Sequence, residues 1–336
     1  MSKKIFLVSA LLLAAFALTS ARAQTPTTTA APVAAPAAQQ PAVAPQPAHA
    51  STEDIDTSGA IRKSVNEVNL IFTVTDKHGQ FISDLRQSDF ALLDDQKAPS
   101  KISRFVQQTN LPLRVGIVID ASNSIRQRFV FEQEASTEFL VDVLKSRADR
   151  AFVMGFDVTP SIMQDWTNNL DALQSGISRL RPGGGTALYD AVYTACRDKL
   201  LDSSRGQEPV RKAMILLSDG DDNQSRASLD DSIKMCERAE TIVYSISTNW
   251  TPSRGPGDKA LTRLSEATGG RVFFPPQMED MAANFDAIKQ ELRSQYALTY
   301  TPADFKTDGG FRPIYLFALD RRYNVRARKG YFAPKE

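Results

Sequence analysis

Short runs of apolar residues alternate with amphipathic stretches along the middle of the chain. Several runs are apolar on both faces, as buried parallel strands are, and the stretches between them have the apolar spacing of helices. This alternation predicts an α/β fold, a doubly wound and mostly parallel sheet wrapped by helices. The expected strands cover 115–119, 151–156, 213–217, 242–247 and 271–274, with a short edge strand at 161–167, and the expected helices cover 129–145, 170–180, 187–201, 229–239, 259–267 and 281–292.

The pattern changes in the segments on either side, 51–109 and 295–336, where apolar and polar residues alternate singly. That period of two is typical of antiparallel strands with one buried face. Each segment is too short to bury a sizeable core alone, whereas together they have the size of one β-sandwich. We therefore expect a β-sandwich-like domain interrupted by the α/β domain at 110–294, with separate packing of the two segments as the alternative. The expected strands lie at 68–74, 81–85, 90–93, 101–106, 296–300, 313–319 and 324–328.

The start of the chain has the layout of an export signal. Lys3 and Lys4 precede an apolar run at 5–18, and small residues follow at Ala21 and Ala23. The run is shorter than the roughly 20 residues that span a bilayer, so cleavage after residue 23 is expected, and an uncleaved anchor is the alternative. Residues 24–50 are rich in Ala and Pro and carry no charge, which predicts a disordered tether. We expect a periplasmic, cell-envelope or secreted protein, with the tether as a route to envelope association.

Charge and cysteine content exclude several classes of function. Lys plus Arg total 40 against 39 acidic residues, so the basic excess of a general nucleic-acid binder is missing. With two His and two Cys in the whole chain, a structural zinc site is excluded and His-dependent catalysis lacks parts. Cys196 and Cys236 lie on the helices expected before and after the strand at 213–217. A disulfide between them and two free thiols both stay open.

Polar residues with metal-binding chemistry follow two of the buried strands. Asp120, Ser122 and Ser124 come directly after one strand, Asp219 comes after another, and three consecutive glycines bring Thr186 to the same edge. A hard cation such as Mg²⁺ prefers oxygen ligands, which the three hydroxyl groups supply. The two carboxylates can then hold the hydroxyls and metal-bound waters from behind. A cation ligated mainly by neutral oxygens keeps much of its charge and attracts a carboxylate from another molecule.

Other sites are weaker. No Gly-Lys-Ser/Thr follows the glycines at 183–185, so nucleotide binding is not expected. No Gly-x-Ser-x-Gly turn is present, and His49 and His78 lie outside the α/β segment, which disfavours a Ser-His-Asp hydrolase. We expect the acidic turn at 221–223 and the basic residues of 321–329 to be solvent-exposed surface, not binding sites.

The Asp-x-Ser-x-Ser pattern at 120–124, together with Thr186 and Asp219, resembles the metal-ion-dependent adhesion site of von Willebrand factor A-type domains. The flanks are similar to exported acidobacterial-type proteins of this family, through Asp76–Gly79 and the Arg-Lys-Gly-Tyr at 328–331.

The resemblance implies that Ser122, Ser124 and Thr186 ligate the metal directly or through water, while Asp120 and Asp219 act mainly through water. It implies a non-enzymatic binding or adhesion protein that recognises an Asp or Glu carboxylate of a protein partner through a divalent cation. Mg²⁺ fits best, with Mn²⁺ and Ca²⁺ open. A metal-dependent hydrolase, a structural envelope component with a purely stabilising metal site, and ordinary turn and cap roles for these residues are the alternatives.

Overall fold

The structure is a computed structural model that describes residues 66–108, 111–126, 128–201, 210–249, 251, 253–277 and 280–335. The expected export signal at 1–23 and tether at 24–50 lie outside the described residues. Within the described part, no helix combines the length and the apolar character needed to cross a membrane.

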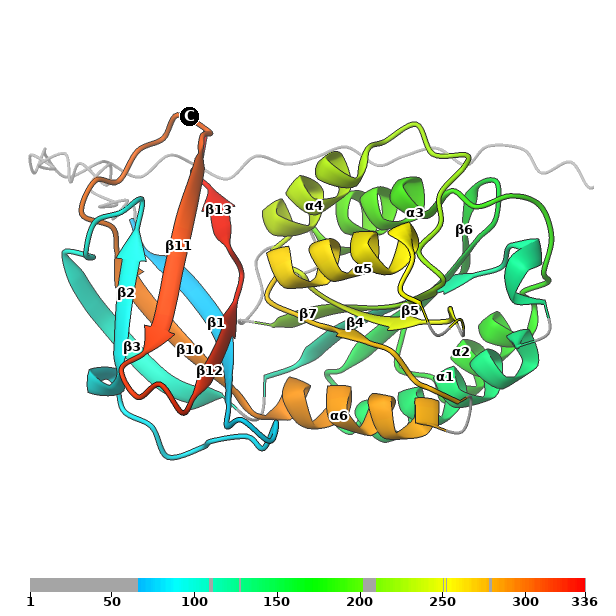
Figure 1. Cartoon of the computed structure of the whole chain (residues 1–336), viewed down its shortest axis with the longest axis horizontal. Helices are drawn as coiled ribbons and strands as arrows, with labels where there is room; N and C mark the ends of the chain where they lie inside the picture. Colours follow the sequence, from blue (N-terminus) through cyan, green and yellow to red (C-terminus); the bar gives the residue numbers. More distant parts are fainter. Residues whose placement is uncertain are drawn as a thin grey trace, which may run out of the picture. The chain divides into compact units, whose positions relative to one another are not determined.

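A six-stranded sheet forms the centre of the α/β part, in the order β6-β5-β4-β7-β8-β9 (Figure 1). All neighbouring strands are parallel except the edge strand β6, which is antiparallel to β5. The chain runs outward from β4 to β6 and returns on the other side of β4 at β7, so the strand order reverses between β4 and β7. The strands are β4 Leu113–Asp120, β5 Arg150–Phe156, β6 Pro160–Thr167, β7 Arg211–Ser218, β8 Ile242–Ser247 and β9 Val272–Phe273.

Helices cover both faces of this sheet, which confirms the predicted α/β fold. Figure 1 shows α1, α2 and α6 on one face and α3, α4 and α5 on the other. Each face buries its own core, because the side chains of β4, β5 and β7 are apolar on both sides. The helices are α1 Phe129–Val143, α2 Leu170–Ser178, α3 Leu188–Thr194, α4 Leu229–Arg238, α5 Pro256–Ala267 and α6 Met281–Arg293.

Two antiparallel sheets contain strands from both flanking segments, in the orders β12-β1-β10-β3 and β13-β11-β2. Phe72 pairs with Tyr296 across β1 and β10, and their rings stack with centroids 5.5 Å apart. β3 and β10 are neighbours, so the chain leaves for the α/β part from one strand and returns on the next. The strands are β1 Val68–Thr75, β2 Phe90–Asp94, β3 Lys101–Gln108, β10 Gln295–Thr301, β11 Phe311–Ala318, β12 Asn324–Ala327 and β13 Gly330–Phe332.

Arginines of the basic segment connect the antiparallel strands to the α/β part. Arg326 lies 2.8 Å from the carboxylate of Glu291 at the end of α6, and Arg271 lies 2.6 Å from it. Arg328 pairs with Glu240 at 2.9 Å and donates to the carbonyl of Asn69 at 2.8 Å. The expectation of a solvated basic face is therefore wrong for Arg326 and Arg328, although Arg321, Arg322 and Lys329 are exposed.

Two local features differ from what the sequence patterns predict, and a third decides whether the two cysteines form a disulfide. Residues 81–85 form no strand, because the Tyr296 hydroxyl donates to the Ile82 carbonyl at 3.0 Å and accepts from the Leu85 amide at 3.2 Å. The helix expected at 187–201 continues past α3 as a π-helical segment, Ala195–Leu200. Cys196 in that segment forms a disulfide with Cys236 of α4, their Cα atoms 5.1 Å apart.

Candidate functional site

Three loops meet where the strand order reverses, at the carboxyl ends of β4 and β7. The loop after β4 and the glycine-rich loop before α3 are joined by the Gly183 amide, which donates to the Ala121 carbonyl at 2.7 Å. The loop after β7 is joined to the glycine-rich loop by the Asn223 amide, which donates to the Thr186 carbonyl at 3.0 Å. This is the place where open α/β sheets bind ligands.

Four of the five predicted metal-site residues are linked by hydrogen bonds. The hydroxyls of Ser122 and Ser124 lie 2.9 Å apart, and the Ser124 hydroxyl donates to Asp219 at 2.8 Å. Asp120 is fully buried and accepts from the Ser122 amide at 2.8 Å. Its second oxygen accepts from the Ser218 hydroxyl at 2.7 Å. The two hydroxyls and two carboxylates therefore form one continuous polar chain between β4 and β7.

Thr186, the fifth residue, reaches the same place through its backbone. Its amide donates to the Asn223 side chain at 3.0 Å, and its carbonyl accepts from the amides of Asn223 and Gln224. Thr186 is 4% exposed. Its place in the glycine-rich loop makes its hydroxyl a candidate for a further oxygen ligand.

A close approach of two glycines holds the loop after β7 against α5. Gly220 has a φ of 84°, which disfavours any side chain, and a Cβ there would lie 2.3 Å from the Gly257 carbonyl oxygen. A Cβ on Gly257 would in turn lie 2.5 Å from the carbonyl oxygen of Asp219. The position of the Asp219 backbone therefore depends on two residues without side chains.

The site has more acidic groups than cations to match them. Burial raises the pKa of Asp120 to about 6, against the lowering effect of its hydrogen bonds. Glu132 on α1 is also fully buried, and its two carboxylate oxygens have no hydrogen-bond partner among the described residues. Burial and the charges of Asp120 and Asp219 raise the pKa of Glu132 to about 8, although Arg128 opposes this. Such shifts mark a region where a positive charge would be strongly stabilised.

The donor set fits a hard divalent cation. Three hydroxyls and two carboxylates offer only oxygen atoms, the ligands that Mg²⁺ prefers. Among the described residues, no group of three or more His, Cys, Asp or Glu side chains is placed to hold a metal, so carboxylates alone do not make the site. Neutral hydroxyls would have to contribute, as the sequence pattern predicts.

The sequence patterns do not identify several residues that orient the loops of the site. Ser218, Asn223 and Asn123 each make a bond that orients the loops, the last by donating to the Gly184 carbonyl at 3.3 Å. The place of Ser218 beside Asp219 is a signal for its role, whereas the sequence pattern at Asn223 predicts only a solvated turn. Nothing in the local sequence marks Glu132, because its position on α1 faces the core only in the folded chain.

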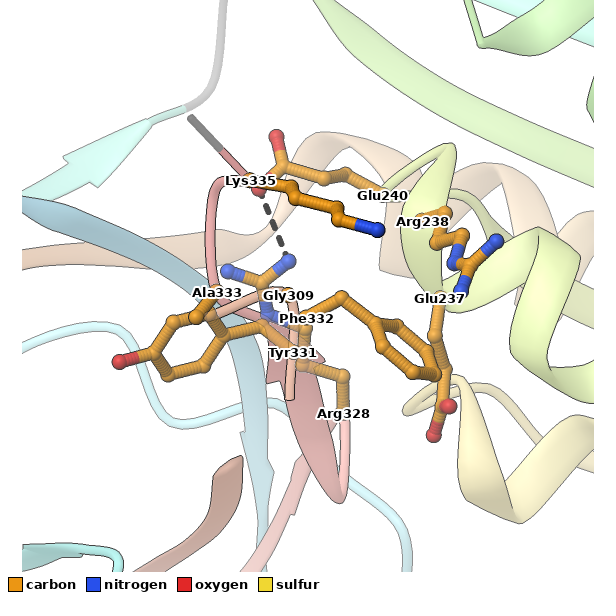
Figure 2. Close-up of a pocket in the computed structure, with 9 residues that line it drawn as sticks. All are labelled: Glu237, Arg238, Glu240, Gly309, Arg328, Tyr331, Phe332, Ala333 and Lys335. Atoms are coloured by element: carbon orange, nitrogen blue, oxygen red, sulfur yellow. Dashed lines mark hydrogen bonds and ion pairs between the residues drawn. The ribbon is translucent and has the colours of Figure 1, made fainter. Parts of the chain in front are cut away.

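A second hollow of about 390 Å³ lies between α4 and the C-terminal strand β13 (Figure 2). Figure 2 shows the Phe332 ring projecting toward Glu237 and Arg238 of α4, and the Arg238 guanidinium lies 4.5 Å from the centre of that ring. None of its lining residues belongs to the three loops. Its charges are of both signs, and Arg328 is already paired with Glu240. This lining offers no set of oxygen ligands like the one between β4 and β7.

Comparisons with known proteins find similar proteins at low sequence identity. A curated relative from Nocardia farcinica (strain IFM 10152), described as a UPF0353 protein, is 22% identical over 226 residues, which are 59% of this chain and 65% of the relative. The chain thus spans less than two thirds of that relative's length.

Two solved structures are similar at low sequence identity. The von Willebrand factor type A structure from Catenulispora acidiphila is 14% identical, with a TM-score of 0.46 over 81% of this chain and 75% of that one. Proximal thread matrix protein 1 from the mussel byssus, solved with a zinc-occupied MIDAS motif, is 16% identical, with a TM-score of 0.47 over 60% of this chain and 50% of that one.

The family profile described as von Willebrand factor type A domain matches residues 115–287, which begin within β4 and end within α6. This match covers half of the chain and contains all five predicted metal-site residues. The chain therefore belongs to the von Willebrand factor type A domain family.

Proposed function

We propose that this protein binds a protein partner through a divalent cation held between β4 and β7. The observation that supports the proposal most is the chain of hydrogen bonds from Asp120 through Ser122 and Ser124 to Asp219. It gathers oxygen donors at one point, next to acidic groups that have too few cations around them. A divalent cation would replace the hydrogen bond between the two serine hydroxyls and offset the acidic charge.

Each residue has a distinct part in this proposal. Ser122, Ser124 and Thr186 would supply hydroxyl oxygens to the cation. Asp120 and Asp219 would hold those hydroxyls and the metal-bound waters, since both already bond to the serine loop. The cation would supply an open position for a carboxylate of the partner. Mg²⁺ is the best match to this set of hard oxygens, and Mn²⁺ and Ca²⁺ are the closest substitutes.

Binding rather than catalysis is proposed because the matched domain contains no histidine to activate its serine hydroxyls. Neither histidine of the chain lies within the matched domain. The hydroxyls of Ser122 and Ser124 are engaged with each other and with Asp219, and no histidine is available to activate them. Metal-assisted hydrolysis is the competing function, since a bound cation can polarise a phosphoester.

We also propose that residues 1–23 are an export signal and residues 24–50 a tether, which would put the binding outside the cytoplasm. Cleavage between residues 23 and 24 is tested by sequencing the amino terminus of the protein recovered from its host. An amino terminus at Gln24 would support export by a cleaved signal, and an intact terminus in the cytoplasmic fraction would contradict it.

The proposed function is tested by capture of partners from envelope extract, with the full chain as bait, in Mg²⁺ and in chelator. Ser122→Ala removes one proposed ligand, and Ser103→Ala is the matched control, because Ser103 is an exposed serine of β3. Partners held only in Mg²⁺, lost with Ser122→Ala and kept with Ser103→Ala, are expected. Binding that is unchanged by chelator and by Ser122→Ala would contradict the proposal and favour a structural role for the metal site. Chelator-sensitive turnover of a phosphoester would favour the hydrolase.

A further inference from the structure

We infer that the partner presents two neighbouring carboxylates, one for the cation and a second for Arg126 on the rim of the site. The inference rests on the proposed function and adds to it a class of partner, an acidic segment with paired Asp or Glu residues. It follows from the way in which the loop after β4 holds Arg126.

Arg126 closes the short 3-10 helix Asn123–Ile125 that carries Ser124. Its backbone amide donates to the Asn123 carbonyl at 3.5 Å, and its guanidinium donates to the Asn123 side-chain oxygen at 3.1 Å. Asn123 in turn donates to the Gly184 carbonyl in the glycine-rich loop. A long side chain is thus tied to the two loops that would hold the cation, and part of its conformational entropy is already lost before a ligand arrives.

The rest of the Arg126 guanidinium is open. Arg126 is exposed, and among the described residues only Asn123 hydrogen-bonds to its side chain. A guanidinium carries five N–H donors in a planar fork that matches a carboxylate. A partner carboxylate on the cation would give at least one oxygen to the metal, so it could not also pair bidentately with this fork. The fork therefore suits a second carboxylate on the same segment.

The loop after β7 carries the reverse charge. Asp221 in that loop is exposed, and its amide donates to Asp219 at 3.2 Å. Asp222 beside it is engaged, since it accepts from the Tyr189 amide and the Ser225 hydroxyl.

The rim is therefore polarised, with Arg126 after β4 and Asp221 after β7. A segment with a second acid on the Asp221 side would be repelled, and the same acid on the Arg126 side would be attracted. Paired carboxylates give the segment a direction as well as affinity. A single carboxylate in a neutral segment would gain neither.

The experiment compares synthetic peptides by isothermal titration against the full chain, in Mg²⁺ and in chelator. One peptide carries a single Asp in a neutral background, and a series carries two Asp residues separated by zero to three neutral residues. The variants are Arg126→Gln, Arg126→Lys and Asp221→Asn. Arg322→Gln is the matched control, because Arg322 is an exposed arginine that also pairs with a neighbour, Asp320.

In Mg²⁺ we expect the best two-Asp peptide to bind about fivefold more tightly than the single-Asp peptide, as an exposed charge-assisted pair allows. Arg126→Gln should abolish this advantage, Arg126→Lys should keep part of it because the charge stays while the fork is lost, and Arg322→Gln should keep all of it. Asp221→Asn should tighten two-Asp peptides about twofold.

The possible failures of the two ideas differ. Equal, Mg²⁺-dependent binding of both kinds of peptide would overturn the inference and leave the proposed function standing. An advantage that survives Arg126→Gln would also overturn the inference. The absence of Mg²⁺-dependent binding for every peptide would contradict the proposed function and the inference together.

Discussion

Two polar clusters in this molecule bury acidic side chains in opposite ways. At the connection to the antiparallel strands, the buried carboxylate of Glu291 is matched by two arginines, Arg271 and Arg326. Between β4 and β7, Asp120 is just as buried, and the hydrogen bonds that it accepts come from Ser122 and Ser218. Glu132 nearby is also buried, and the charge of Arg128 only partly offsets the rise in its pKa.

The charge of the cluster at Glu291 is balanced within the chain, whereas the cluster between β4 and β7 keeps an excess of negative charge. A buried acid between two arginines has its charge compensated within the chain, so its role is to hold α6 and β9 against β12. Acids held by neutral hydroxyl and amide groups gain from an added cation, which is the expectation for a binding site. Substitutions that remove charge from each cluster in turn test this difference.

The largest effect is expected from Glu291→Gln. This change leaves Arg271 and Arg326 without their shared carboxylate, and breaking a buried ion pair on one side costs about 3–5 kcal/mol. Urea unfolding should show that loss of free energy, while the folded fraction should still respond to Mg²⁺. Glu266→Gln is the control, since Glu266 is exposed on α5. A free energy of unfolding unchanged by Glu291→Gln would refute the structural role of this cluster.

The next effect concerns Asp120→Ala. At a Mg²⁺ concentration one hundred times the dissociation constant, the natural chain should gain about 2.7 kcal/mol over the same chain in chelator. Asp120→Ala should lose this gain, while its stability in chelator balances the removal of a buried acid against the lost acceptor of the Ser122 amide and the Ser218 hydroxyl. Thermal unfolding in Mg²⁺ and in chelator measures the gain from Mg²⁺ and the stability without it. An Mg²⁺ gain that persists in Asp120→Ala would place the cation elsewhere.

Glu132 predicts a dependence of stability on pH in chelator. Its folded pKa of about 8 lies above the ordinary 4.5, so between these values the folded chain keeps a proton that the unfolded chain releases. Stability contributed by this group is complete below pH 4.5 and is lost as pH rises toward 8. Glu132→Gln should therefore be more stable than the natural chain at pH 8 and nearly equal to it at pH 4.5.

Denaturant unfolding across this range gives the difference between the two proteins at each pH. Glu138→Gln is the matched control on the same helix, since Glu138 is exposed. A difference that stays constant with pH would show that Glu132 is ionised in the folded chain and would contradict its raised pKa.

The smallest effect is expected from Ser124→Ala. Its hydroxyl links Ser122 to Asp219, so its loss removes one proposed ligand and two hydrogen bonds while leaving both carboxylates. We expect about tenfold weaker Mg²⁺ binding, about 1.4 kcal/mol, measured by titration calorimetry. Affinity equal to that of the natural chain would remove Ser124 from the ligand set.

The sequence predicts the parts of this molecule that depend on local patterns. The alternation of apolar runs predicts the central parallel strands β4, β5, β7 and β8, because they are buried on both faces and contain few polar residues. The site residues follow from Asp-x-Ser-x-Ser and from the glycine-rich loop, since the ends of parallel strands must meet at one edge.

What the sequence misses depends on contacts between distant residues. The apolar residues at 81–85 suggest a strand, yet Tyr296, more than 200 positions later, takes up their backbone groups. Arg326 looks like a surface residue because its partner, Glu291, lies on a helix in another part of the fold. Glu132 looks like an ordinary helical acid because its neighbour Asp120 comes close only through β4.

The central claim is that the loops after β4 and β7 hold one divalent cation. Electron paramagnetic resonance of Mn²⁺ titrated into the chelator-treated full chain tests it most directly, because free Mn²⁺ gives a signal that bound Mn²⁺ loses. The account predicts one bound Mn²⁺ per chain, displaced by excess Mg²⁺ and abolished in Asp120→Ala and Ser122→Ala. Mn²⁺ that stays free with the natural chain, or binds both variants equally well, would contradict it.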